Sequence, residues 1–308
     1  MAELNATALG VAPCAGALVR YDGGYGCIHP WPSLGDADIE EQLAQLARDE
    51  PSALGLRALE CCAIDGAARR ERRNLFAGLE VPRSHVTAPA GEQADVLMNR
   101  ASGFGVEGFD IVKMKVGADV AQEAARVNTF AALWRQVHAE NRIRLDFNGT
   151  LDPEDFRGFA GMLSPEAIGM IDFVEDPCPY DPIVWRSLQR DTGLTFALDH
   201  GAEHHCSDEG FSVRVWKPAC SPQPEPFDGE RLVVTSYMDH AVGQVFAAYE
   251  AARCPGPVDT CGLLTHPLFA DDPFFAMLSV KNTRLVSPEG PGIGFGAMLE
   301  ALPWKPLT

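Results

Sequence analysis

Short apolar stretches that end in charged residues recur through the middle of the chain. The first, residues 111–116, alternates apolar residues with Lys113 and Lys115, a pattern that predicts a β-strand. Four later stretches end, in order, in Asp146, Glu175, Asp199 and Lys217. Counted from Lys115, the separations are 31, 29, 24 and 18 residues, about the length of one strand and helix of a parallel barrel. The spacing predicts that each charge lies at the C-terminal end of its strand.

Amphipathic stretches between these strands predict the helices that connect them. The helices are expected at residues 91–100, 120–139, 152–163, 181–189 and 241–253. Further strands are expected near residue 85, at 232–236 and at 257–262. The proline-rich residues 221–226 cannot form a helix interior, so the unit after Lys217 should be shortened. The alternation is typical of parallel β/α packing.

The first part of the chain has a different pattern. Residues 8–28 alternate apolar segments with a glycine-rich turn at 21–26, which predicts antiparallel strands joined by a hairpin. Two helical stretches follow, at 38–47 and 51–77. Small helices against a short sheet predict an α+β domain beside the barrel.

Length, charge and cysteine content limit the domain organisation, the binding partners and the cellular compartment that we expect for this protein. A chain of 308 residues fits a barrel with a small second domain. The net charge of −18 argues against nucleic acid or an anionic membrane as a partner. Nine cysteines without paired spacing indicate reduced thiols, and neither a signal peptide nor an apolar run of ~18 residues is visible. We expect a soluble cytoplasmic protein; the sequence indicates no oligomeric state.

The charged strand ends suggest a metal site flanked by lysines. Three carboxylates that converge on one mouth repel each other unless a hard divalent cation lies among them, and oxygen ligands suit Mg²⁺. Lys113 and Lys115 are two residues apart and so share one face of their strand. Close ammonium groups depress each other's pKa, which is one route to a lysine base. The alternatives are a solvated edge strand and ordinary strand-end ion pairs.

Five short segments resemble a known family. They are Lys113-Met114-Lys115, Asp146-Phe147-Asn148, Val174-Glu175-Asp176-Pro177, Ala197-Leu198-Asp199 and Trp216-Lys217-Pro218. The ordered set resembles the enolase superfamily in its muconate-lactonising branch. Three flanking segments, Gly24–Gly26, Leu232–Ser236 and Gly292–Gly296, are similar to the o-succinylbenzoate synthase family, the dehydratases of menaquinone synthesis.

The resemblance implies an α/β fold with two parts. The larger part is a modified TIM barrel, (β/α)7β, expected at residues 85–288. The smaller part is an α+β capping domain built from the N-terminal segment, 1–84, and the C-terminal tail, 289–308. The tail is expected to return to the cap after the barrel ends.

The resemblance also implies roles for the charged residues. Asp146, Glu175 and Asp199 are expected to bind Mg²⁺, with Mn²⁺ as a possible substitute. Lys115 is expected to remove the α-proton of a small carboxylate, 2-succinyl-6-hydroxy-2,4-cyclohexadiene-1-carboxylate, and to return it to the departing hydroxyl. Lys113 is expected to hold the carboxylate and to lower the pKa of its neighbour, and Lys217 to stabilise the enolate from across the mouth.

Six further residues are candidates for substrate contacts. Asn148 shares a face with Asp146. The hydroxyl or backbone N–H groups of Ser236, Thr260 and Gly262 are expected to donate to the succinyl carboxylate. Tyr25 and His29, with nearby Trp31, are candidates for pocket walls. Each is equally consistent with an ordinary loop residue.

Several other functions remain open at this level. The same catalytic residues suit an N-acylamino acid racemase or dipeptide epimerase, and then a muconate cycloisomerase. Mandelate-racemase chemistry is disfavoured because that branch has a histidine where this chain has Lys217. A barrel that binds a carboxylate without turnover is the alternative of another class. A zinc site at residues 200–206 lacks a second ligand cluster, and His200 departs from the acid that often follows the third metal ligand.

Overall fold

The structure is a computed structural model that describes residues 2–4, 14–94, 96–98, 108–117, 119–205, 210–225, 229–269 and 272–308. The start of the first expected strand, at residues 8–13, lies outside the described residues. The same holds for parts of the helix expected at 91–100 and of the histidine-rich tract at 200–206. No helix in the described ranges is long and apolar enough to cross a membrane.

A parallel seven-stranded sheet forms the body of the protein. Its strands, in spatial order, are β10 (Arg231–Val234), β9 (Val213–Trp216), β8 (Phe196–Leu198), β7 (Ile171–Glu175), β6 (Arg142–Asp146), β5 (Ile111–Lys115) and β4 (Val86–Ala88). Each strand pairs in parallel with its neighbour. Since sequence order and spatial order coincide, the chain winds steadily around one axis, as the strand spacing predicts.

A short eighth segment bridges the two edges of this sheet. Gly262 pairs in parallel with Thr235, next to β10, and Cys261 pairs in parallel with Ser84, next to β4. The Cys261 carbonyl accepts the His85 N–H at 2.8 Å. These isolated bridges connect the two edges of the sheet at residues 261–262, but the described chain forms no regular strand at residues 257–262, where an eighth strand was expected.

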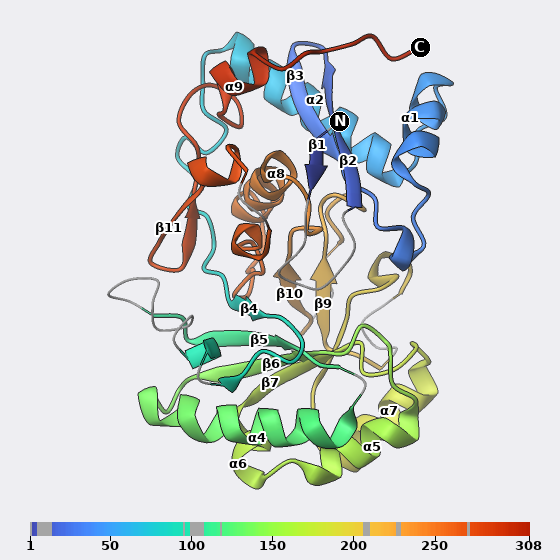
Figure 1. Cartoon of the computed structure of the whole chain (residues 1–308), viewed down its shortest axis with the longest axis vertical. Coiled ribbons are helices and arrows are strands. Elements are labelled where there is room, and N and C mark those ends of the chain that lie inside the picture. Colours follow the sequence, from blue (N-terminus) through green and yellow to red (C-terminus); the bar gives the residue numbers. More distant parts are fainter. Residues whose placement is uncertain are drawn as a thin grey trace.

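Helices cover the outside of the barrel. They are α4 (Val120–Val137), α5 (Pro153–Met162), α6 (Pro165–Met170), α7 (Pro182–Thr192) and α8 (Ala241–Ala252). The first four lie along the outer side of β5, β6 and β7 (Figure 1). The carboxylates of Asp119, Asp152 and Asp181 accept backbone N–H groups in the first turns of α4, α5 and α7, which fixes where each helix begins. Helix α6 was not expected from the sequence pattern.

The cap is an antiparallel sheet covered by helices. It contains β1 (Ala2–Leu4), β2 (Cys14–Tyr21), β3 (Gly24–Ile28), η2 (Pro32–Leu34), α1 (Ile39–Ala47) and α2 (Ala53–Arg70). Helix α2 packs so closely on β3 that a Cβ at Gly24 or Gly26 would clash with the backbone carbonyl of Cys62 or Ala58, respectively. The absence of a side chain at these glycines therefore permits this packing. Helix α2 ends at Arg70, earlier than the pattern over 51–77 predicts, and Arg72 then takes a positive φ of 53°.

The end of the chain returns to the cap. A short helix, η3 (Ala202–His204), follows β8 in the barrel. The elements after α8 are η5 (His266–Leu268), η6 (Phe275–Met277), β11 (Ser279–Lys281), β12 (Arg284–Val286) and α9 (Gly296–Glu300). Asp65 of α2 accepts the N–H of Ile293 at 2.7 Å and the N–H of Tyr25 at 3.0 Å. Both ends of the chain therefore build the cap (Figure 1), as expected. The boundaries 1–84, 85–288 and 289–308 stay a prediction.

An ion-pair network fills part of the barrel interior. Arg144 is fully buried, and its Nε donates to Asp172 Oδ2 at 2.8 Å. Its Nη1 donates to the Thr260 carbonyl at 2.6 Å, and its guanidinium lies 4.5 Å from the centre of the Phe173 ring. Arg144 precedes the strand-end Asp146 by two residues, so this network lies one layer below the charges at the barrel mouth.

Candidate active site

Six charged side chains lie at one end of the barrel. Lys113 and Lys115 come from β5, Asp146 and Glu175 end β6 and β7, and Asp199 and Lys217 directly follow β8 and β9. The strand register places Lys115 opposite Asp146, and Asp146 opposite Glu175. The structure therefore brings together all six residues that the strand spacing indicated.

The two lysines of β5 have different environments. Lys113 Nζ lies 2.8 Å from Asp146 Oδ2 and 2.6 Å from Glu175 Oε1. Lys115 Nζ lies 2.6 Å from Asp146 Oδ2 and 3.0 Å from Asn148 Oδ1. The Lys115 side chain is 21% exposed and that of Lys113 is 9% exposed. Lys115 is therefore the more accessible ammonium group.

Opposing effects set the charges in this cluster. Burial alone would raise the pKa of Asp146, but the neighbouring Lys113 and Lys115 lower it well below its ordinary value. Burial alone would lower the pKa of Lys113, but Asp146 and Glu175 raise it. Burial, and then the charge of Asp146, raise the pKa of Glu175. The carboxylates thus dominate the protonation of Lys113.

Lys217 faces this cluster from the other side of the mouth. Its Nζ pairs with Asp199 Oδ2, and the Tyr237 ring centre lies 5.5 Å away. Burial alone would lower the pKa of Lys217, but the charge of Asp199 raises it. Lys217 is therefore a partly buried cation, 17% exposed, that Asp199 holds opposite Lys115.

The buried carboxylates fit a hard divalent cation. Asp146, Glu175 and Asp199 are each less than 10% exposed. Oδ1 of Asp199 is buried and has no hydrogen-bond partner among the described residues. A buried carboxylate oxygen without a partner is costly, and an oxygen-only donor set is the one that Mg²⁺ prefers.

A second set of potential metal ligands overlaps the first. Asp176, Asp199 and His200 offer ligand atoms within 4.8 Å of one another. His200 Nδ1 lies 3.0 Å from Asp176 Oδ2, and this hydrogen bond is the main cause of the raised pKa of His200. Asp199 belongs to both sets, so it is the carboxylate on which either arrangement depends.

Asp176 has a structural role that the sequence pattern did not indicate. Its carboxylate accepts the backbone N–H groups of Asp199 and His200, each at 3.1 Å, and its φ is 43°. It therefore holds the chain where β8 ends, directly beside Asp199. The available signal was a second acid after the strand-end Glu175, followed by Pro177.

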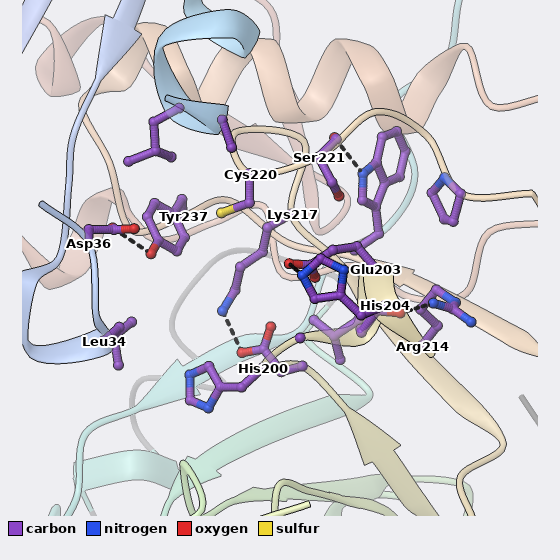
Figure 2. Close-up of a pocket in the computed structure, with 18 of the residues that line it drawn as sticks. Leu34, Asp36, His200, Glu203, His204, Arg214, Lys217, Cys220, Ser221 and Tyr237 are labelled. Atoms are coloured by element: carbon purple, nitrogen blue, oxygen red, sulfur yellow. Dashed lines mark hydrogen bonds and ion pairs between the residues drawn. The ribbon is translucent and has the colours of Figure 1, made fainter. Parts of the chain in front are cut away.

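Two cavities meet at Lys217. The smaller, about 430 Å³, lies at the barrel mouth, where both lysines of β5 reach it. The larger, about 740 Å³, reaches to Asp36, Glu203 and Cys220 (Figure 2). Residues that line both cavities include Asn148, Asp199, His200, Lys217 and Tyr237. The smaller cavity is the candidate active site, because Lys115 and Lys217 both line it.

The candidate substrate-binding residues divide into two groups. Asn148, Ser236, Gly262 and Trp31 line the smaller cavity. The Gly262 N–H, however, donates to the Val234 carbonyl at 2.8 Å, so the expected donation from this N–H to a substrate is wrong. A Cβ at Gly262 would lie 2.8 Å from Thr235 Cγ2, which explains why this close contact needs glycine.

Three of the candidates do not line either cavity. Thr260 lies in the deeper Arg144 network described above. Tyr25 is 3% exposed, and its ring packs 5.4 Å from that of Trp304 in the cap. His29 is 2% exposed and packs against Trp31. Their proposed contact with substrate is therefore corrected: Tyr25 and His29 are buried in the cap, and the Thr260 carbonyl is bound by Arg144.

Other residues at the smaller cavity were not singled out from the sequence. They are His85, Thr87, Val116, Thr150, Thr265 and Leu268. Ser236 Oγ and Thr265 Oγ1 lie 2.7 Å apart, so these two hydroxyls form one polar wall. His85 and Thr87 flank Val86 at the start of β4, but no local signal shows that they face the mouth.

His29 predicts a dependence of stability on pH. Both ring nitrogens are buried without a hydrogen-bond partner among the described residues. Burial, and then the neighbouring His240, lower its pKa to about 4. As pH falls below ~6.5, His29 becomes protonated in the unfolded chain, whereas in the folded protein it stays neutral until about pH 4. The free energy of unfolding therefore decreases over this window.

We therefore expect wild type to lose about 2 kcal/mol more stability than His29→Phe between pH 7 and pH 5. The measurement is the free energy of unfolding in urea at both pH values. His138→Gln, which removes an exposed histidine, is the control and should behave as wild type. An equal loss in wild type and His29→Phe would show that His29 does not carry the effect.

Two family models match the chain. Residues 1–68 match the N-terminal domain of O-succinylbenzoate synthase, and residues 97–207 match the enolase C-terminal domain-like model. A relative in Bdellovibrio bacteriovorus named o-succinylbenzoate synthase is 32% identical over 297 residues, covering 92% of this chain and 87% of the relative. An Aliivibrio salmonicida protein of the same name is 30% identical over 110 residues, covering 36% of this chain and 32% of the relative.

Solved structures share the fold at lower identity. A mandelate racemase/muconate lactonizing enzyme from Roseiflexus sp. has a TM-score of 0.74 and 19% identity, with 92% of each chain covered. A dipeptide epimerase from Enterococcus faecalis has a TM-score of 0.71 and 18% identity, with 93% of this chain and 95% of that chain covered. Together they match a barrel with an N-terminal cap.

Proposed function

Because the chain belongs to the enolase superfamily and, within it, to the o-succinylbenzoate synthase family, we propose that it dehydrates 2-succinyl-6-hydroxy-2,4-cyclohexadiene-1-carboxylate to o-succinylbenzoate. The observation that carries the proposal is that Lys115 and Lys217 face one cavity beside three buried carboxylates. A base and an opposing cation are what removal of a proton next to a carboxylate requires. The reaction is a carbon–oxygen lyase reaction.

Lys115 is the proposed general base. It is the more accessible of the two β5 lysines, and Asn148 Oδ1 accepts one of its hydrogen bonds and so orients its Nζ. Its neutral amine takes the α-proton of the substrate. The resulting ammonium then gives a proton to the departing hydroxyl, so that water leaves and the ring becomes aromatic.

Lys113 and Lys217 supply positive charge at two sides of the substrate. Lys113 is held between Asp146 and Glu175, where it can stabilise the substrate carboxylate but has little freedom to move. Lys217 lies across the cavity, where its ammonium stabilises the negative charge that develops as the proton leaves. Neither of these lysines is assigned the proton transfer.

Asp146, Glu175 and Asp199 are the proposed holders of Mg²⁺, with Mn²⁺ as a substitute; when bound, the ion supplies positive charge that stabilises the negative charge developing on the substrate carboxylate. The unpartnered Asp199 Oδ1 supports this assignment. Ser236 and Thr265 offer hydroxyls to the succinyl carboxylate from the opposite wall of the cavity.

The product suggests a pathway and a location. o-Succinylbenzoate formation places the protein in menaquinone biosynthesis, as the resemblance implied. Seven cysteines in the described part of the chain are free thiols, which is typical of a reducing compartment, so we place the reaction in the cytoplasm. The proposed partner is a small carboxylate substrate.

A racemase or epimerase is the second candidate. The opposed positions of Lys115 and Lys217 favour it, since the two lysines can exchange the roles of base and acid on opposite faces of an α-carbon. The dipeptide epimerase from Enterococcus faecalis has the same fold. Fold alone does not select between these reactions, because specificity lies in the residues around the cavity.

Turnover of the purified protein tests these proposals. With Mg²⁺ and the cyclohexadiene substrate, we expect ultraviolet absorbance to report rapid loss of the diene. If the diene persists while an N-succinylamino acid or dipeptide exchanges its α-proton in D₂O, the racemase or epimerase proposal takes its place. If neither reaction occurs, a barrel that binds a carboxylate without turnover is favoured.

A further inference from the structure

We propose that Asp36, in the cap, is a positioning residue that holds Tyr237 against Lys217 of the barrel. The proposal rests on the proposed function, since it concerns how the lysine opposite the base is held. Asp36 lines the larger cavity and not the smaller one where Lys115 lies. It therefore acts through Tyr237 rather than on the substrate.

The Asp36 carboxylate joins two parts of the fold through one oxygen. Its Oδ2 accepts the Tyr237 hydroxyl at 2.8 Å and the Trp31 N–H at 2.7 Å. The Trp31 indole Nε1 donates in turn to the Tyr237 carbonyl at 2.8 Å. Two of these hydrogen bonds link residues 31–36 of the cap to Tyr237, after β10, and the third joins Trp31 to Asp36 within the cap. We call Asp36, Trp31 and Tyr237 the cap latch.

The cap latch ends at the catalytic cavity. Tyr237 is 8% exposed, and its ring centre lies 5.5 Å from Lys217 Nζ, within the range of a cation–π contact. Figure 2 shows Tyr237 between Asp36 and Lys217, with the Asp36 hydrogen bond on the side away from the lysine. The ring is thus held at its hydroxyl end by the cap while its face limits where Lys217 can lie.

A separate cap contact supports the same part of the barrel. Arg57 of α2 is 4% exposed, and its Nε donates to the Pro218 carbonyl at 2.7 Å. Pro218 directly follows Lys217. The cap therefore contacts the backbone beside Lys217 independently of Asp36, so loss of Asp36 should displace the lysine side chain without releasing its backbone.

Two measurements that need no catalysis test the cap latch directly. In Asp36→Ala we expect hydrogen exchange in residues 29–36 to accelerate at least about tenfold, because the Trp31 N–H loses its acceptor. We also expect reductive methylation of Lys217, followed by mass spectrometry, to become several-fold faster in Asp36→Ala and in Tyr237→Phe. Glu40→Gln, an exposed acid in α1, is the matched control and should change neither rate.

Kinetics test the consequence for the proposed reaction. We expect Asp36→Ala and Tyr237→Phe each to lower kcat about tenfold with a smaller change in KM, because Lys217 acts on developing charge rather than on binding. The kcat of the double variant should be no lower than that of the less active single variant, because both substitutions break the same hydrogen bond, between the Tyr237 hydroxyl and Asp36. Asp36→Asn, which keeps an acceptor oxygen, should recover part of the loss.

The outcomes separate this proposal from the proposed function. Unchanged exchange and unchanged Lys217 labelling in Asp36→Ala would overturn the cap latch, whatever the reaction. Multiplicative losses of kcat in the double variant would also overturn it. If the protein fails to turn over the cyclohexadiene substrate but exchange and labelling respond as expected, the proposed function fails and the latch stands.

Discussion

Replacing Lys115 with alanine is expected to lower kcat on the cyclohexadiene substrate by about 10⁴-fold, the upper range for a general acid–base residue. The expected loss is large because Lys115 is assigned both the removal of the proton and its return. Lys113 cannot take over, since Asp146 and Glu175 hold its ammonium at 2.8 and 2.6 Å. Steady-state turnover of the purified variant, followed by absorbance, measures the effect.

Lys115→Arg separates the role of charge from that of proton transfer. Arginine keeps the positive charge beside Asp146, but its pKa above about 12 prevents it from acting as a base. We expect this variant to bind o-succinylbenzoate and yet to be as inactive as Lys115→Ala. Lys281→Ala, on the exposed strand β11, should keep wild-type turnover. Near-normal turnover by Lys115→Arg would rule out Lys115 as the base.

Asp199→Asn is expected to lower kcat by about 10³-fold and to weaken Mg²⁺ binding. The change removes the charge from the oxygen that has no hydrogen-bond partner and from the oxygen that pairs with Lys217. Titration calorimetry with Mg²⁺ measures the metal affinity independently of turnover. Asp191→Asn, which alters an exposed ion pair with Arg157, is the control and should leave both quantities unchanged.

Two more variants decide between the overlapping acidic sets. Glu175→Gln should weaken Mg²⁺ binding if Asp146, Glu175 and Asp199 hold the ion. His200→Gln should weaken it instead if the ligands are Asp176, Asp199 and His200. Unchanged Mg²⁺ affinity in Asp199→Asn would contradict both arrangements, because Asp199 belongs to each. The position of Lys113 between Asp146 and Glu175 makes this test informative, since the lysine occupies space near the first set.

The sequence by itself determined the barrel and the positions of its charged strand ends. Both follow from local rules: alternation places Lys113 and Lys115 on one face, and a strand that ends in an acid carries it to the edge of a parallel sheet. The spacing of the strands then requires one direction of winding. The five strand-end positions, from the lysine pair to Lys217, needed no long-range information.

Only the tertiary structure decided how these residues differ from one another. Lys113 and Lys115 have the same periodicity and both pair with Asp146, yet Lys113 also pairs with Glu175, whereas Lys115 donates to Asn148. Likewise Thr260 lies with Arg144 in the barrel interior, and Tyr25 lies in the cap. Burial and partner choice depend on segments distant in sequence, so periodicity carries no information about them.

The cap latch is the clearest example of this limit. Asp36 and Tyr237 are 201 residues apart, and each belongs to a loop whose sequence predicts only a turn or a strand end. Their hydrogen bond exists because the cap and the barrel pack together. Local sequence determined which residues end each strand. Packing between distant segments decided that Tyr237 contacts Lys217 and that Asp36 binds Tyr237.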